Sequence, residues 1–175
     1  MVVIRVNAAR LELEAPYHPA LPYRARQAGG TWLGQAIGWV FPLKEETALR
    51  ALCQDIWGVD GSVAATEDVV DLQITVDERV PFRSVFEAHE TPIYLVGREI
   101  AASLRNLRGA RAGRGIRFLT GKPRCLASSS TWSTCIPDGA VFVIRDVPRC
   151  ATGRFLEAVS GAGHVEETAP RMADA

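Results

Sequence analysis

Residues 11–58 are the most constrained stretch of this sequence, because turn-forming residues divide them into short segments of regular pattern. Leu11 and Leu13 alternate with Glu12 and Glu14, a period of two that is typical of a half-buried strand. Val2, Ile4 and Val6 show the same alternation just before it. Two short strands, or one strand with a bend, are therefore expected at the start of the chain.

A helix is expected next, over residues 19–27. Pro19 is preorganised for a helix start, and Pro22 must lie within the first turn or break the helix. Gly29-Gly30 follows and ends the helix, because glycine readily adopts the positive φ that a helix C-terminus needs.

A hairpin and a second helix complete the stretch. Residues 31–33 and 38–41 are rich in aromatic and β-branched residues, which favour strands. Residues 45–57 then carry apolar side chains at helical spacing, and Gly58 ends them. The apolar positions are Leu49, Leu52, Cys53, Ile56 and Trp57. The order strand, helix, hairpin, helix predicts a small module that spans residues 1–60.

The rest of the chain predicts a second, β-rich unit. Residues 61–71 are small and polar and then acidic, which is typical of a linker, and a domain is expected over residues 72–160. Leu72, Ile74 and Val76 predict a half-buried strand. The sequence also predicts strands over 92–96, 115–120, 131–136 and 140–146, a short helix over 100–107, an exposed loop over 109–115 and a final helix over 148–159. A disordered tail is expected over residues 161–175. The expected fold class is α+β, in two small units.

Composition limits the possible functions. With 47% hydrophobic and 23% charged residues, the chain is typical of a globular protein with a packed core. No apolar run reaches the roughly 18 residues that a membrane-spanning helix needs, and the first residues do not resemble a signal peptide. A cytoplasmic protein without a membrane partner is expected. Because 20 basic and 20 acidic residues cancel, attraction to nucleic acid would have to come from local segregation of charge.

Such segregation occurs in residues 97–124, called the basic segment below. It holds eight basic residues and one acidic residue, Glu99, a net charge of +7. Guanidinium groups make bidentate contacts to phosphate, so the segment is interpreted as a nucleic-acid contact surface. The alternative is a solvated face that balances the acidic run of residues 67–90, in this chain or in a second copy. The candidate phosphate contacts are Arg98, Arg105, Arg108, Arg111, Arg114, Arg117, Lys122 and Arg124. Arg105, Arg108 and Arg111 would share one side if the helix over 100–107 continued.

The first module offers a second set of candidates. Trp32, Trp39 and Tyr17 could stack on unpaired bases or fill the core of a domain this small, and both readings are open. Arg24 and Arg26, on the first helix, are the candidate phosphate contacts there, or else ordinary solvent-facing residues.

The titratable residues predict neither a metal site nor a cofactor. Four cysteines without a CxxC pair indicate free thiols in a reducing cytoplasm. The alternatives are a disulfide between Cys125 and Cys135, or a zinc site that adds His89 to both. A metal-dependent nuclease would draw on acidic side chains of the β-rich domain, namely Asp71, Asp77, Glu87 and Glu90.

The first module contains three short motifs, Tyr17-His18-Pro19, Gly29-Gly30-Thr31-Trp32 and Gly38-Trp39-Val40-Phe41. Together they resemble the HARP domain, which accompanies annealing helicases of the SNF2 class. The resemblance covers residues 11–58 and implies a scaffold that contacts DNA forks or branched DNA. This sequence departs from the family in having no lysine or arginine between Gly34 and Gly38. It also has no GxxxxGK[ST] motif, so the resemblance implies no helicase activity.

The sequence therefore predicts a non-enzymatic nucleic-acid-binding protein, with DNA the favoured partner. An inhibitor or adaptor of a nucleic-acid enzyme, of the anti-restriction or anti-CRISPR type carried by mobile elements, is the first alternative. A small metal-dependent nuclease is the second. A protein partner or a homo-oligomer also fits the opposed acidic and basic segments.

Overall fold

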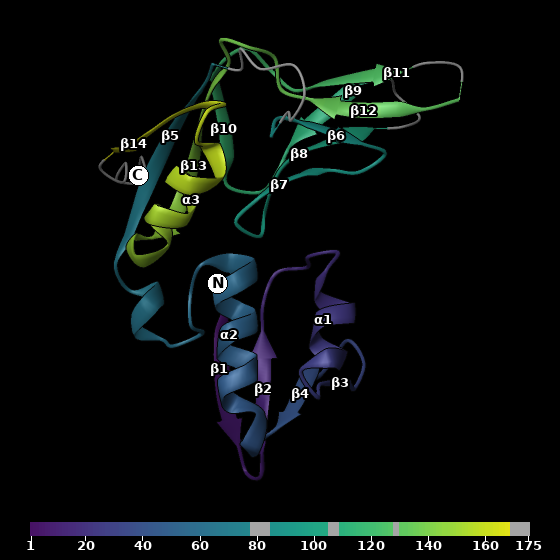
Figure 1. Cartoon of the computed structure of the whole chain (residues 1–175), viewed down its shortest axis with the longest axis vertical. Coiled ribbons are helices and arrows are strands. Elements are labelled where there is room, and N and C mark those ends of the chain that lie inside the picture. Colours follow the sequence, from purple (N-terminus) through teal and green to yellow (C-terminus); the bar gives the residue numbers. More distant parts are fainter. Residues whose placement is uncertain (78–84, 105–108, 128–129, 169–175) are drawn as a thin grey trace. The chain divides into compact units, whose positions relative to one another are not determined.

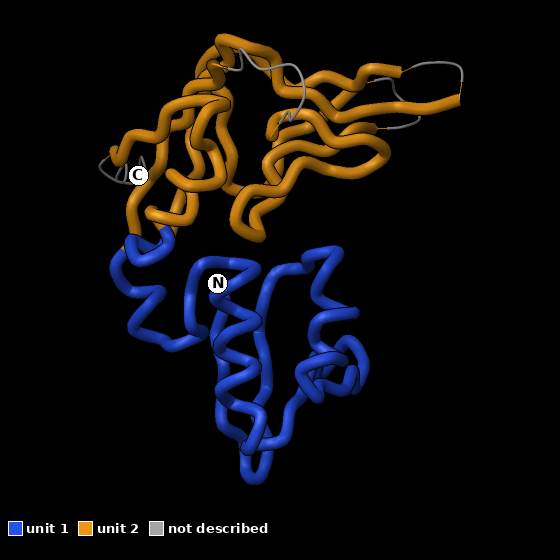
Figure 2. Tube along the Cα trace, in the orientation of Figure 1, with its two compact units in different colours: residues 1–68, 148–151 blue, residues 69–147, 152–175 orange. Residues whose placement is uncertain are grey.

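A computed structural model describes residues 1–77, 85–104, 109–127 and 130–168 (Figure 1). Within these residues it contains three α-helices and fourteen strands, which confirms the α+β fold class. The chain divides into two compact units, coloured separately in Figure 2. Unit 1 comprises residues 1–68 and 148–151, and unit 2 comprises residues 69–147 and 152–175.

Unit 1 contains an antiparallel four-stranded sheet. Its order is β1-β2-β4-β3, with β1 (Val3–Asn7), β2 (Arg10–Glu14), β4 (Trp39–Pro42) and β3 (Thr31–Trp32). The expected hairpin is confirmed, since Trp32 pairs with Trp39. Gly38 closes the connection by donating its N–H to the Gly34 carbonyl at 2.8 Å.

The helices of unit 1 follow the predicted pattern. They are α1 (Leu21–Gln27), the 3₁₀ turn η1 (Leu43–Glu45) and α2 (Glu46–Trp57). All five apolar positions predicted for α2 are buried. Gly58 ends α2 with a φ of +71° and donates its N–H to the Gln54 carbonyl. A further 3₁₀ turn, η2 (Ala64–Thr66), lies in the segment that was expected to be a linker.

The core of unit 1 is packed around Phe41, which is 1% exposed. Gly30 lies against its ring. A Cβ at position 30 would come within 2.5 Å of the Phe41 ring and 2.8 Å of the Ala25 carbonyl oxygen. Only glycine fits there, and this close approach holds the end of α1 against the sheet.

Unit 2 contains a second four-stranded sheet, of order β10-β13-β5-β14. The strands are β10 (Ile116–Thr120), β13 (Val141–Pro148), β5 (Val69–Val76) and β14 (Gly163–Thr168). The predicted alternation in β5 is confirmed, because Leu72, Ile74 and Val76 are buried. The turn η3 (Arg149–Ala151) and helix α3 (Thr152–Val159) match the predicted final helix, and α3 lies against this sheet (Figure 1).

Two three-stranded sheets complete unit 2. One has the order β7-β8-β9, with β7 (Ile93–Leu95), β8 (Arg98–Leu104) and β9 (Gly109–Ala112). The other has the order β11-β12-β6, with β11 (Arg124–Ala127), β12 (Trp132–Cys135) and β6 (Glu87–His89). The buried Thr134 joins them, since its hydroxyl accepts the Ser103 N–H at 3.2 Å and donates to the Thr91 carbonyl at 3.0 Å.

Three local predictions for unit 2 are wrong. The helix expected over 100–107 is strand β8 up to Leu104, and the rest of it falls outside the described residues. Ile100, Ala101 and Ala102 are all buried, so this strand is covered on both faces and shows no alternation. The loop expected over 109–115 begins with strand β9. Part of the expected tail is β14, which pairs with β5 from Gly163 to Thr168. Among the described residues, no helix is long and apolar enough to cross a membrane.

Candidate nucleic-acid interface

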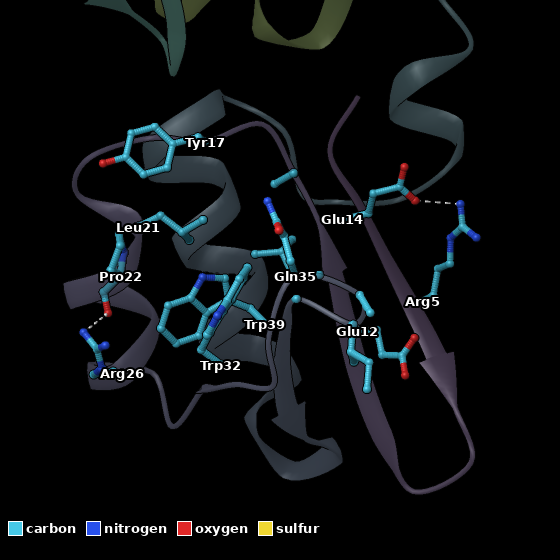
Figure 3. Close-up of a pocket in the computed structure, with 15 residues that line it drawn as sticks. Arg5, Glu12, Glu14, Tyr17, Leu21, Pro22, Arg26, Trp32, Gln35 and Trp39 are labelled. Carbon is cyan, nitrogen blue, oxygen red and sulfur yellow. Dashed lines mark hydrogen bonds and ion pairs between the residues drawn. The ribbon is translucent and has the colours of Figure 1, made fainter.

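A groove of about 670 Å³ opens on unit 1, and it is called the aromatic groove below (Figure 3). Residues of β1, β2, α1 and the 32–39 hairpin line it. Its aromatic side chains differ in exposure. Trp39 is 6% exposed and belongs to the core, whereas Trp32 is 50% exposed and Tyr17 is 71% exposed. The core reading therefore holds for Trp39, and the other two rings are open to solvent.

Trp32 and Trp39 touch without covering each other. Their ring centroids are 5.6 Å apart, and the ring planes are tilted by 57°. Because the planes are not parallel, Trp39 does not stack flat on Trp32, and a large part of the Trp32 ring remains accessible.

The two arginines of α1 have different surroundings. Arg24 forms an ion pair with Asp55 of α2. The Arg26 guanidinium lies 5.6 Å from the Trp39 ring centroid, a cation–π geometry, and donates to the Pro22 carbonyl at 3.2 Å. Among the described residues, Arg26 has no carboxylate partner.

The opposite side of the groove carries paired charges. Arg5 lies 2.7 Å from the Glu14 carboxylate, and Arg10 lies 2.6 Å from Glu12. Hydrogen bonds from Arg10, and then from Asn7, lower the pKa of Glu12. Each of the two carboxylates is paired with an arginine of the same sheet, so this side of the groove offers no unpaired carboxylate from Glu12 or Glu14.

Arg98 and Arg111, in the basic segment, are engaged by their own unit. Arg98 donates to the Arg145 carbonyl at 2.8 Å and more weakly to the Asp146 carbonyl. Burial lowers the pKa of the Arg98 guanidinium, against an opposing effect of the Asp146 carboxylate. Arg111 pairs with Glu99 at 2.8 Å. Both side chains connect strands of unit 2, which leaves less of their charge for a ligand.

Four other cations of the basic segment are exposed: Arg114, Arg117, Lys122 and Arg124. No carboxylate of the described residues lies within ion-pair distance of them. Arg114 is in the turn before β10, Arg117 is in β10, and Lys122 and Arg124 follow that strand. Arg105 and Arg108 lie outside the described residues. Arg111 is in strand β9, so the predicted helix side shared with Arg105 and Arg108 is wrong.

Strand pairing adds one cation that the sequence analysis missed. In β10–β13, Arg117 pairs with Val143, and Arg145 lies two residues further along β13 on the same face. The Arg145 N–H also donates to the carbonyl of Gly115, the residue after Arg114. Arg117 and Arg145 therefore lie on one face, and Arg114 is in the turn that precedes β10. These three residues are called the basic face below. Arg145 is exposed, with no carboxylate partner in the described part of the chain.

The alternatives based on cysteine are wrong. Cys125 pairs with Thr134, whereas Cys135 is the next residue along β12. Since successive side chains of a strand point to opposite faces, Cys125 and Cys135 do not meet. All four cysteines are free, as the main prediction stated. His89 pairs with Ser133, which puts it on the face of Cys135 and away from Cys125.

The four acidic candidates for a nuclease site do not gather either. Asp71 and Asp77 are six residues apart along β5 and its end, about 20 Å in an extended strand. The Asp71 carboxylate is occupied by the Asp146 N–H at 3.1 Å. Nowhere in residues 1–77, 85–104, 109–127 and 130–168 do three or more His, Cys, Asp or Glu side chains form a group that could hold a metal ion.

A comparison with protein-family models, curated proteins and solved structures finds no match to this chain.

Proposed function

We propose that this protein binds nucleic acid through the basic face, with Lys122 and Arg124 extending the contact. One observation carries the proposal. Arg117 and Arg145 are exposed on one face of the β10–β13 pair, and Arg114 is exposed in the adjoining turn. None of the three has a carboxylate partner among the described residues, although the chain as a whole is neutral. Unpaired guanidinium groups on one face are suited to successive phosphates.

DNA is the favoured partner within this proposal. The resemblance of residues 11–58 to the HARP domain supports DNA over RNA, because that family is associated with forked and branched DNA. The protein acts as a binding protein and not as an enzyme. Incubation with labelled DNA and added magnesium or manganese tests this last point, since cleavage would contradict it.

The experiment compares binding to labelled duplex, forked and single-stranded DNA at low and moderate salt. In the triple variant Arg114→Gln/Arg117→Gln/Arg145→Gln, the slope of log affinity against log salt should fall by about 3, at roughly 0.9 per phosphate contact. Affinity at low salt should fall with it. The absence of any mobility shift for the unaltered protein would contradict the proposal.

A matched control variant also replaces three arginines by glutamine, at positions outside the basic face. Arg50, Arg149 and Arg154 each hold a carboxylate in an exposed or partly exposed ion pair, at 2.7, 3.0 and 3.7 Å. Such pairs contribute about 1 kcal/mol or less, so the triple glutamine variant at these positions should fold. If it weakens DNA binding as much as the basic-face variant does, general charge and not the basic face is responsible.

A second candidate function is a protein inhibitor of a nucleic-acid enzyme. Leu119 and Leu126 are each about half exposed, two residues along the chain from Arg117 and Arg124. Protein interfaces are enriched in such combinations of arginine and apolar side chains. The test is inhibition of a purified restriction endonuclease. Inhibition that survives in the basic-face variant but is lost in Leu119→Ser/Leu126→Ser would favour this function. If inhibition is lost in the basic-face variant but kept in Leu119→Ser/Leu126→Ser, the protein inhibits by covering the DNA and not by binding the endonuclease.

A further inference from the structure

We propose that the aromatic groove of unit 1 binds one unpaired nucleobase, so that the protein prefers nucleic acid with single-stranded positions. This inference rests on the proposed function. It adds a second site that recognises bases, whereas the basic face recognises phosphates.

The first support is the exposure of two aromatic rings in one cavity. Single exposed aromatic residues are common on protein surfaces. Tyr17 and Trp32, however, line the same groove, and the buried Trp39 lies beside Trp32 in it (Figure 3). The volume of about 670 Å³ lies within the range of small-molecule sites. Base stacking on such rings contributes about 1–3 kcal/mol per base and needs no particular sequence.

The second support is an unused amide group. Gln35 is exposed in the hairpin connection and lines the groove, and its side chain has no hydrogen-bond partner among the described residues. An amide offers both a donor and an acceptor, as the edges of all four bases do. In the view of Figure 3, Gln35 lies between the aromatic residues and the Arg5–Glu14 pair.

The charges of the groove favour a base over a phosphate chain. Arg26 is on one side and has no carboxylate partner among the described residues, whereas the arginine on the other side, Arg5, is paired with Glu14. A phosphate is therefore attracted to Arg26 at the edge of the groove and not to its opposite side. An uncharged planar base can therefore occupy the interior while its own phosphate contacts Arg26.

The experiment uses the full chain and three labelled probes of equal length. They are oligothymidylate, the same sugar–phosphate strand without bases, and a blunt duplex. Affinities are measured by fluorescence anisotropy. The unaltered protein should bind oligothymidylate at least 5-fold more tightly than the strand without bases, as expected for one stacked base. Equal affinities for these two probes would overturn the inference.

The variant Tyr17→Ala/Trp32→Ala should lose the preference for bases and keep its duplex affinity within 2-fold. Both side chains are largely exposed, so the fold should persist, and far-ultraviolet circular dichroism checks this. Tyr23→Ala is the matched control, because Tyr23 is an exposed aromatic residue of α1 that does not line the groove. An equal loss of base preference in Tyr23→Ala would overturn the inference.

Two further outcomes separate this inference from the proposed function. If the protein binds duplex but does not distinguish the two single strands, only the base site is contradicted. If it binds none of the three probes, both proposals are contradicted. A protein partner is the other possible occupant. Loss of self-association in Tyr17→Ala/Trp32→Ala, without any change in DNA affinity, would assign the groove to protein contacts and overturn the inference.

Discussion

The aromatic groove of unit 1 and the basic face of unit 2 use their arginines in different ways. Around the groove, Arg5, Arg10 and Arg24 are each paired with a carboxylate. On the basic face, Arg117 and Arg145 have no such partner among the described residues. The groove thus offers shape and aromatic surface, whereas the basic face offers charge. A count of arginines in the sequence does not distinguish these roles, but their pairing in the fold does.

The largest effect is expected from a substitution that displaces the end of α1 beside the groove and leaves the basic face unchanged. Gly30→Ala forces a methyl group against the Phe41 ring and a backbone carbonyl, and neither can move freely. Overpacking of this kind should cost about 3 kcal/mol of unfolding free energy. Urea denaturation measures this loss. Under conditions where the variant is folded, base preference should fall and duplex affinity should remain.

Gly153→Ala is the matched control for this variant. Gly153 lies in α3, and a Cβ there would meet no atom within 4 Å. Since alanine favours helix over glycine, this variant should match or slightly exceed the stability of the unaltered protein. Equal stabilities for Gly30→Ala and the unaltered protein would show that the groove is not held by the close packing described here.

Effects of intermediate size are expected for two arginines of the basic segment, which should differ in what they change: one stability, the other the salt dependence of binding. Arg98→Gln removes a charged donor from two carbonyls and should cost about 2 kcal/mol of unfolding free energy, with little effect on the salt slope of binding. Arg117→Gln should change stability by less than about 0.5 kcal/mol and reduce the salt slope by about 1. Unfolding curves and binding titrations of both variants provide the test. The opposite assignment of effects would contradict the division between engaged and free arginines.

The smallest expected effect is a dependence on pH confined to unit 1. His18 accepts the Ala20 N–H through Nδ1 at 3.3 Å, which requires a neutral ring. Burial, and then Arg24, lower the pKa of His18. Below about pH 6.5, the unfolded chain takes up the proton before the folded one does. The free energy of unfolding should therefore decrease from pH 6.5 downward, until the pH has passed the lower pKa of the folded state.

The variant His18→Asn keeps an acceptor at this position and removes the titration. Its unfolding free energy, measured between pH 7.5 and 5.5, should decrease less than that of the unaltered protein. Parallel pH profiles for the two proteins would contradict this assignment. Because the basic face contains no histidine, duplex binding should report no matching change over this range.

The sequence correctly predicted those helices and strands that bury a single face and expose the other. Helix α2 and strand β5 are examples, because burial along a single face leaves a regular period. It failed for β8, where Ile100, Ala101 and Ala102 are all buried and the spacing of larger residues imitates a helix. It also failed for β9, where Gly113 suggests a loop. A Cβ at that position would lie 1.7 Å from the Glu99 carbonyl oxygen, so this glycine permits a close approach of two chain segments.

Candidate site residues divide in a similar way. The presence of the basic segment was evident from composition alone, and Trp32 could be named from the hairpin. The contribution of Arg145 depends on the register of β10 against β13, which no local pattern encodes. The engagement of Arg98 depends on carbonyls 47 and 48 residues away along the chain. Both are tertiary properties.

Residues 148–151 belong to unit 1, although the residues on both sides of them belong to unit 2. The chain therefore passes between the units three times, where two tandem modules would need a single passage. The returning segment bonds to the end of the first one, since the Arg149 N–H donates to the Asp68 carbonyl at 2.9 Å and its guanidinium pairs with the Asp68 carboxylate. A fragment that stops at residue 68 would lose this closure. Recombination, truncation and domain grafting are thus expected to succeed only when the two units are transferred as one piece.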